Sequence, residues 1–293
     1  MKSTHYSHLP TTGDGDLVLF RDAAITYAAC RRQGGVLLLE SSESARDLLE
    51  WLGIDGERSG PAEGIVYLDP ARQAPEGLEI RSLPAWTRQT LSLESFRQQG
   101  YVAEAMFAAL IRSSYGPDRL DFFPTRSELG FYFDDSLLLS GPARWDQEYL
   151  TACQAFFMEE LMPAELLEKS LALLPASRRH GLAQASRRWD PELRGVTFLV
   201  ASELVSLLPL ARLLEGLLAL DAPVGGLKEL VQGVATWERD SWSAAWQAQP
   251  EERRQRLAAA LCPEFTEQAE PILYAAGPEL LLWRAGAVTE ALR

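Results

Sequence analysis

Lysine and histidine are scarce in this chain of 293 residues, and each absence excludes a class of chemistry. Each occurs three times, at Lys2, Lys169, Lys228, His5, His8 and His180. Serine and cysteine nucleophiles usually need a histidine base, and no G-x-S-x-G sequence accompanies these histidines. The glycines before Lys228 lack the spacing and the hydroxyl of a P-loop, and no G-x-G-x-x-G follows an early strand. The sequence therefore argues against P-loop NTPases and standard dinucleotide enzymes, and it predicts no cofactor.

Cysteine is equally rare, and long hydrophobic runs are missing. Three widely spaced cysteines, Cys30, Cys153 and Cys262, fit a reducing compartment better than a disulfide framework. The first residues contain no apolar run, so a signal peptide is not expected. The most apolar stretch, residues 196–220, is interrupted by charges and a proline, which a membrane span would not carry near its middle. These features predict a cytoplasmic protein without a membrane span.

The chain is acidic, and its composition is that of a globular protein. Its formal net charge is −13, with 47% apolar and 24% charged residues. A general nucleic-acid binder would present a basic face, so this charge argues against nucleic acid as a partner and favours another protein. The oligomeric state is not indicated.

The first half of the chain alternates between short aliphatic runs and amphipathic stretches. Residues 1–16 are polar and glycine-rich and are expected to form a flexible tail. The aliphatic runs at 17–20, 36–40, 65–68 and 78–80 are typical of strands. Helices are expected at 23–32 and after Ser42, a good N-cap residue. Residues 17–141 are thus predicted to form a small α/β layer domain.

The second half has almost no strand signal. Eight of the nine prolines from Pro163 to Pro278 separate helical stretches, and proline is tolerated in the first turn of a helix. Trp145, Trp189, Trp237 and Trp283 recur every 44 to 48 residues, which is compatible with stacked helical hairpins. Residues 142–293 are predicted to form an all-helical bundle or a short solenoid-like domain, and the fold class is α+β overall.

An acidic pair stands between two apolar runs. Asp134 and Asp135 follow Phe131 to Phe133 and precede Leu137 to Leu139, a pattern that predicts a β-hairpin with an acidic turn. With Asp121 nearby, such a pair suits a divalent metal ion. The alternative is a plain turn, where aspartate is favoured for backbone reasons.

One basic cluster and one aromatic cluster are candidates for partner binding. The basic cluster comprises Arg178, Arg179, His180, Arg187 and Arg188. On a helix some of these would share a face and could dock an acidic group, or they could pair with the many surrounding acids. Trp242 and Trp246 would share a helical face, either in the core or at a binding surface.

Two functions remain open on the sequence alone. The first is a non-catalytic intracellular protein-binding factor: an adaptor, a chaperone-like protein or a toxin-neutralising partner, acting through an acidic, helix-rich surface. The alternative is an enzyme that binds a small or phosphorylated ligand at the carboxyl edge of the N-terminal sheet, with carboxylate or metal chemistry. Its candidate carboxylates are Glu40, Asp69, Asp134 and Asp135.

Overall fold

The computed structural model describes residues 4–9, 16–56, 64–68, 78–86, 91–115, 123–139, 141–218, 244, 247–252, 254–256 and 264–284. The chain divides into two compact units, Met1–Phe157 and Met158–Arg293. This division falls after the boundary near residue 141 that the sequence indicated. Each unit is described by itself.

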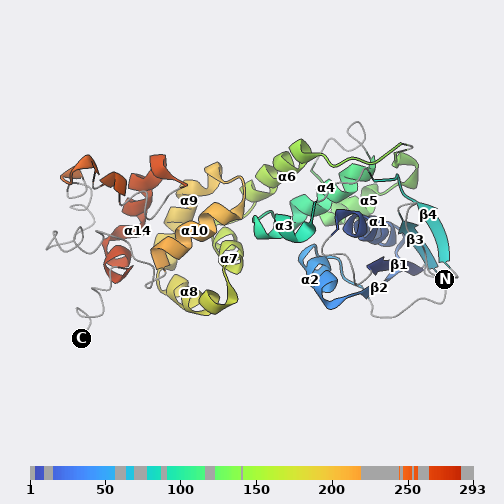
Figure 1. Ribbon diagram of the computed structural model, residues 1–293, viewed down its shortest axis with the longest axis horizontal. Coiled ribbons are helices and arrows are strands. Elements are labelled where there is room, and N and C mark those ends of the chain that lie inside the picture. Colours follow the sequence, from blue (N-terminus) through green and yellow to red (C-terminus); the bar gives the residue numbers. More distant parts are fainter. Residues whose placement is uncertain are drawn as a thin grey trace. The chain divides into compact units, whose positions relative to one another are not determined.

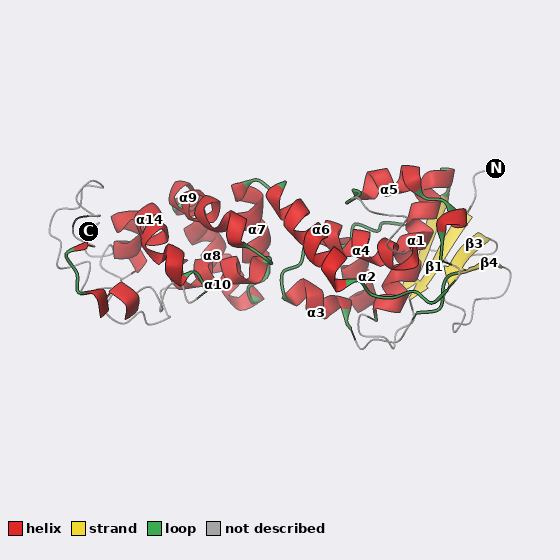
Figure 2. Cartoon of the chain, turned by 90° about the horizontal axis from the view of Figure 1, so that it is seen from above, coloured by secondary structure: helices red, strands yellow, loops and turns green. Residues whose placement is uncertain are grey.

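A four-stranded parallel sheet forms the centre of the first unit, in the order β2-β1-β3-β4. The strands are β1 (Thr4–Leu9), β2 (Val36–Ser41), β3 (Gly64–Leu68) and β4 (Leu78–Ser82). Figure 2 shows the strands together in this unit. The expected strands at 36–40, 65–68 and 78–80 are confirmed. Residues 4–9 were expected to belong to a flexible tail, but they form β1, which pairs with β2 along its whole length.

Helix α1 (Leu17–Gln33) replaces the strand expected at 17–20. Asp16 caps it, since the carboxylate accepts a hydrogen bond from the Val18 amide at 3.0 Å. Gly34, with a φ of 68°, ends it in the left-handed conformation. The helix packs against β1, β2 and β3 (Figure 1), and most of its residues on every side are buried. An apolar run within a fully buried helix resembles a buried strand, which is why the prediction was wrong.

The other helices of the first unit are α2 (Glu43–Trp51), α3 (Leu93–Gln98), α4 (Ala103–Tyr115), α5 (Arg126–Tyr132) and α6 (Gln147–Glu159). As expected, Ser42 caps α2 by accepting a hydrogen bond from the Ala45 amide. Buried Gln154 on α6 accepts a hydrogen bond from the Val102 amide at 2.8 Å, just before α4 begins. Helices far apart in sequence are thereby held together.

Two neighbouring residues of α1 form a buried ion pair. Arg21 is fully buried, and its Nε and Nη2 atoms donate to Asp22 at 3.2 and 3.0 Å. Its Nη1 atom donates to the Pro84 carbonyl at 2.8 Å, and the guanidinium lies 5.0 Å from the Trp86 ring centroid. Buried charges persist in proteins when they are paired and hydrogen-bonded in this way.

The second unit contains α7 (Pro163–Ala172), α8 (Ala176–Arg188), α9 (Asp190–Val200), α10 (Leu207–Leu218) and α14 (Ala269–Arg284), with short 3-10 turns at Ala201–Glu203 and Thr266–Gln268. Pro163 and Pro191 stand in the first turns of their helices, as expected. Trp189 is buried between α8 and α9, 6.0 Å from the Trp283 ring. Trp237 lies outside the described residues.

The coarse prediction of the fold is confirmed: a mixed α/β region precedes a helical region. Among the helices that the structure describes, none is both long and apolar enough to cross a membrane.

Candidate functional site

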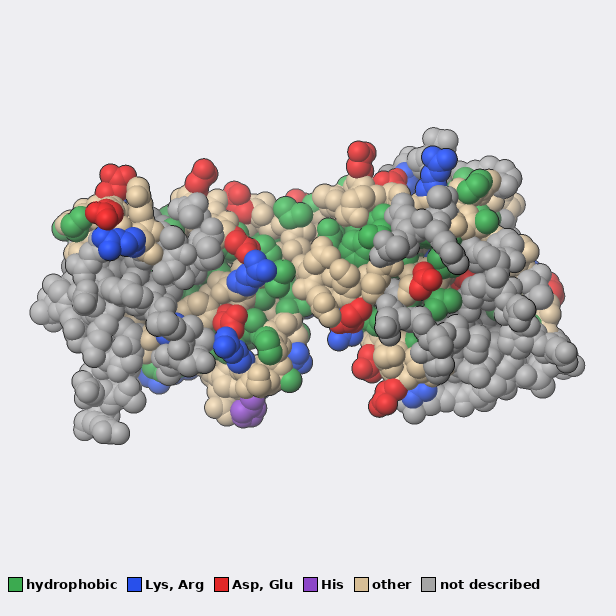
Figure 3. Space-filling model, viewed as in Figure 1, with side chains coloured by type: hydrophobic (Ala, Val, Ile, Leu, Met, Phe, Trp, Pro, Cys, Tyr) green, Lys and Arg blue, Asp and Glu red, His purple; other side chains and the backbone are tan. Residues whose placement is uncertain are grey.

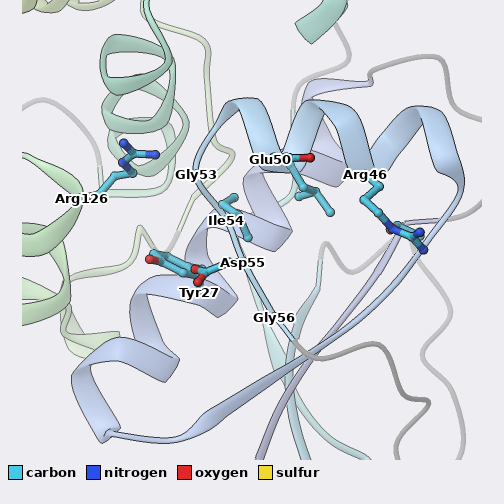
Figure 4. Close-up of a pocket in the computed structure, with 10 residues that line it drawn as sticks. Tyr27, Arg46, Glu50, Gly53, Ile54, Asp55, Gly56 and Arg126 are labelled. Carbon is cyan, nitrogen blue, oxygen red and sulfur yellow. The ribbon is translucent and has the colours of Figure 1, made fainter.

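A cavity of about 560 Å³ opens beside helix α2, near the carboxyl end of β2. Its lining comes from α1, β2, α2, the loop after α2 and the first residue of α5 (Figure 4). The lining residues are Tyr27, Ser41, Arg46, Leu49, Glu50, Gly53, Ile54, Asp55, Gly56 and Arg126. Small-molecule sites generally occupy about 300–1,000 Å³, so the cavity is large enough for a metabolite.

Arg126 enters the cavity from the start of α5. Thr125 and Glu128 form a reciprocal cap there: the Thr125 amide donates to Glu128 at 2.8 Å, and the Glu128 amide donates to the Thr125 hydroxyl at 3.3 Å. The hydrogen bonds from Thr125 hold the pKa of the Glu128 carboxyl below its usual value. The carboxylate therefore stays ionised in its capping role, and the first turn that carries Arg126 is fixed.

The Arg126 guanidinium passes directly over Gly53. It donates to the Leu52 carbonyl at 2.7 Å and to the Glu104 carboxylate at 3.2 Å. A Cβ atom on Gly53 would lie 1.4 Å from Arg126 Nη1, and Gly53 has a φ of 68°. Glycine is therefore required at this position for two reasons: the left-handed turn and the close approach of the guanidinium.

Tyr27 and Asp55 lie on the side of the cavity formed by α1 (Figure 4). Burial raises the pKa of the Tyr27 hydroxyl, and the negative charge of Asp55 raises it further. The hydroxyl therefore remains protonated at neutral pH and can donate a hydrogen bond to a ligand. The Tyr27 ring packs edge-on against Phe107, with centroids 5.9 Å apart, which fixes its direction.

The cavity combines both signs of charge. Arg46 and Glu50 lie one turn apart on α2, and Arg126 and Asp55 line the same space (Figure 4). Guanidinium groups bind carboxylates, and carboxylates bind ammonium groups. The arrangement suits a zwitterionic ligand better than a purely anionic or cationic one.

The sequence did not single out these residues. Arg46 and Arg126 are 80 positions apart, and nothing in their spacing marks them as neighbours. The Leu52-Gly53 step after an amphipathic helix was the available signal, because it marks a left-handed helix end that leaves room above the glycine. The guanidinium that fills this room comes from a distant helix.

The carboxylates expected at the sheet edge are only partly described. Glu40 stands opposite His8 in the register of β2 and β1, one residue before the carboxyl end of each strand. The order of the strands changes direction between β1 and β3, which is where ligands bind in open α/β sheets. Asp69 lies outside the described residues.

The acidic hairpin does not form. Residues 126–132 are helical, and Asp135–Leu137 is a single 3-10 turn. Exposed Asp134 accepts a hydrogen bond from the Ser136 amide at 2.8 Å, and the hydrogen bonds from Ser136 hold the pKa of its carboxyl below its usual value. This is a backbone role for aspartate, as in the turn alternative. Asp121 lies outside the described residues, among which no group of three or more metal-ligating side chains gathers.

The basic cluster lies on α8, whose side chains are mostly exposed. Arg178 forms an ion pair with Glu215 of α10, and Arg179 donates to the Leu174 carbonyl at 3.1 Å. His180 contacts Gln184 through its ring nitrogen, and the Arg188 guanidinium lies 5.1 Å from the Trp189 ring. Arg187 is exposed.

Figure 3 shows basic and acidic side chains next to one another on one face of this unit. The cluster is thus only partly neutralised by acids. Trp242 and Trp246, the other expected binding residues, lie outside the described part of the chain.

The fold of this chain is similar to that of solved glutamate–tRNA ligases. A solved glutamate–tRNA ligase from Elizabethkingia meningosepticum, in complex with its amino acid, superposes with a TM-score of 0.57 and 10% identity over 100% of both chains. The glutamate–tRNA synthetase from Elizabethkingia anophelis gives a TM-score of 0.58 and 10% identity over 99% of this chain and 100% of that one. No protein-family model matches the chain.

A match in sequence points to the same enzymes over a short segment. The glutamate–tRNA ligase of Chloroflexus aurantiacus is 28% identical over 95 residues, which are 32% of this chain. The matched segment spans only 18% of that ligase.

These likenesses overturn the first functional prediction. A non-catalytic adaptor, chaperone-like factor or toxin-neutralising partner is wrong, because the similar proteins named above are glutamate–tRNA ligases. The expectation of a protein partner in place of nucleic acid is wrong for the same reason. Net charge was the misleading signal, since it averages over the whole chain and conceals local clusters such as α8.

Proposed function

We propose that this chain binds glutamate, or a closely related α-amino acid, in the cavity lined by Tyr27, Arg46 and Arg126. The observation that carries the proposal is that two arginines and two carboxylate residues line one cavity. Glutamate presents two carboxylates and one ammonium group, which match the arginines and an acid of the lining. The likeness to a glutamate–tRNA ligase with its amino acid bound supports this choice.

Isothermal titration calorimetry with L-glutamate tests the proposal. Loss of one charged hydrogen bond costs about 1.5–3 kcal/mol, so Arg46→Gln is expected to weaken binding by about tenfold or more. Arg97→Gln is the matched control, because Arg97 is partly exposed on α3, pairs with Glu94 and does not line the cavity. No detectable heat with L-glutamate, or equal affinity in both variants, would overturn the proposal.

The second unit supports a second candidate function, the binding of tRNA through α8. In a chain of net charge −13, this helix carries four arginines in 13 residues and no carboxylate. Arginine is well suited to phosphate groups, and contacts with the RNA backbone need only local positive charge. The ligases that share the fold act on tRNA by name, which supports the choice of RNA.

Filter binding with bulk tRNA across a salt series tests this candidate. Arg187→Gln with Arg188→Gln is expected to weaken binding and to reduce the salt slope by about one for each RNA phosphate that is no longer neutralised. Arg194→Gln is the control, because this exposed arginine already pairs with Asp190 at 2.8 Å. Absence of salt-dependent binding in the unmodified protein would remove the candidate.

Two coarser expectations are kept as proposals. We infer that the second unit is a bundle and not a solenoid, because α9 contacts α14 and α7 contacts α10, whereas solenoid repeats contact only their neighbours. The cytosol is the proposed compartment, and the free thiols of Cys30 and Cys153 support it.

A further inference from the structure

A second cavity, of about 450 Å³, lies in the first unit between the end of α4 and the beginning of α6. It is separate from the cavity beside α2 and shares no lining residue with it. Its lining includes Arg112, Arg144, Asp146, Gln147 and Glu148. No step of the proposed function uses them.

Arg112 is the unusual member of this lining. Its side chain is 9% exposed, and its Nε and Nη1 atoms have no hydrogen-bond partner among the residues described. The guanidinium stacks 4.5 Å from the Tyr149 ring centroid, and its Nη2 atom lies 4.0 Å from Asp146, too far for a hydrogen bond. The unpartnered Nε and Nη1 atoms are buried, but the Arg112 side chain lines the cavity and brings a permanent positive charge to it, which suits an anion.

Helix α6 brings further donors to the same space. Asp146 caps this 13-residue helix, accepting a hydrogen bond from the Tyr149 amide at 2.9 Å. The amides of Gln147 and Glu148, in the first turn, have no partner within the helix, and both residues line the cavity. The helix N-terminus also carries a partial positive charge. The first turn of α6, Arg112 and exposed Arg144 therefore line the same cavity.

We propose that this cavity binds the phosphate group of a small ligand. A phosphate offers several acceptor oxygens and up to two negative charges, so it can engage the arginines and the amides together. The carboxylates of Asp146 and Glu148 line the same cavity and offset the charge of the two arginines. The cavity is larger than a bare phosphate, which leaves room for an attached group such as a nucleoside.

The test titrates the whole chain with inorganic phosphate and with AMP, followed by ³¹P NMR and by thermal shift. Binding that weakens by about tenfold or more in Arg112→Gln and in Arg144→Gln, but not in Arg97→Gln, is the expected result. Tighter binding of AMP than of phosphate assigns the group to a nucleotide, and equal binding assigns it to free phosphate. If Arg112→Gln fails to fold, the exposed Arg144→Gln decides the matter.

Two outcomes overturn the proposal. One is the absence of binding of either probe. The other is binding that both substitutions leave unchanged, which would mean an adventitious ion only. The result is independent of the glutamate proposal, because Arg46→Gln is expected to leave phosphate binding intact and L-glutamate is not expected to displace the phosphate.

Discussion

The two units of the chain place their charges differently. In the first unit, Arg21 and Asp22 are buried as an ion pair, and Arg112 is nearly buried beside a cavity. In the second unit, the described ion pairs are solvent-exposed, as in Arg178–Glu215, where the side chains are 47% and 26% exposed. The first unit therefore depends on buried polar contacts that tolerate few changes, whereas the second depends on apolar helix faces with charges outside.

The unit with the buried charges is also the unit that contains the two cavities. Both cavities described above belong to the first unit, and both are lined by arginines that other elements hold in place. In the second unit, two of the four described ion pairs join residues four apart in the sequence, and the other two, Arg178–Glu215 and Arg212–Glu264, join residues far apart in the sequence at the surface. Substitutions that remove one charge at a time therefore compare how much the buried charges of the first unit and the exposed charges of the second contribute to stability.

The largest effect is expected from Asp22→Ala. The substitution removes the Asp22 carboxylate from the buried Arg21 guanidinium, and breaking a buried ion pair in this way typically costs about 3–5 kcal/mol of unfolding free energy. Urea unfolding, followed by hydrogen exchange at the amides of α1, reports the first unit separately from the second. Replacing the pair together, as Arg21→Met with Asp22→Leu, is expected to cost less, because no buried charge remains. A loss below about 1 kcal/mol for Asp22→Ala would contradict the contrast between the units.

Gly53→Ala should come next and should act on both stability and the glutamate site. The new Cβ collides with Arg126 Nη1, and the left-handed turn adds strain, so a loss of about 1–3 kcal/mol is expected. Gly34→Ala is the matched control, because it has the same φ of 68° and no atom within 4 Å of its Cβ position. Only Gly53→Ala should also weaken L-glutamate binding in calorimetry, and equal losses in both variants would argue against the role of Arg126.

The elements predicted correctly from the sequence are those whose local residue pattern favours the structure that they form in the folded chain. Strand β2 is a run of aliphatic residues after a glycine pair, and α2 begins at Ser42 and keeps its apolar residues on one face. In the second unit, Pro163 and Pro191 mark helix starts because proline lacks the amide that the first turn leaves unused. In these cases the local chemistry and the tertiary environment favour the same structure.

Elements decided by tertiary burial were missed. Strand β1 has no aliphatic run, and it is a strand because β2 and β3 flank it on both sides. Residues 131–139 look like a hairpin, but the capping of α5 by Thr125 and Glu128 favours a helix. The cavities were also missed, because their lining residues come together only in the folded chain. Arg126 contacts Gly53, for example, although the two residues are 73 positions apart in the sequence.

Because the Cys153 thiol is buried, we expect the first unit to lose stability at alkaline pH. Burial raises its pKa to about 12, against a hydrogen bond from Tyr149 and the charge of Arg112, which both lower it. The unfolded thiol ionises near its ordinary value, so between about pH 9 and 12 the folded state holds the proton more tightly. Stability is complete below this range and falls as the pH rises through it, by about 1 kcal/mol at pH 10.

Urea unfolding at pH 8 and pH 10 checks the direction of this change. Alkylation at pH 8, with the modified peptides identified by mass spectrometry, should label Cys153 only as the first unit unfolds. Burial raises the pKa of the Tyr149 hydroxyl as well, so Cys153→Ser should retain part of the alkaline sensitivity. Rapid labelling of Cys153 in the folded protein would show that the thiol is accessible and would remove this prediction.

The smallest effect is expected from Glu215→Gln in the second unit. The carboxylate pairs with Arg178 at the surface, where water and salt screen the interaction, so a loss of about 0.2–1 kcal/mol is expected. The loss should shrink further in high salt, which Asp22→Ala should not show, because that charge is buried. The same variant removes a carboxylate that neutralises α8, so it should also strengthen tRNA binding slightly in the filter assay. A large loss of stability, insensitive to salt, would mean that the second unit relies on its charges as the first unit does.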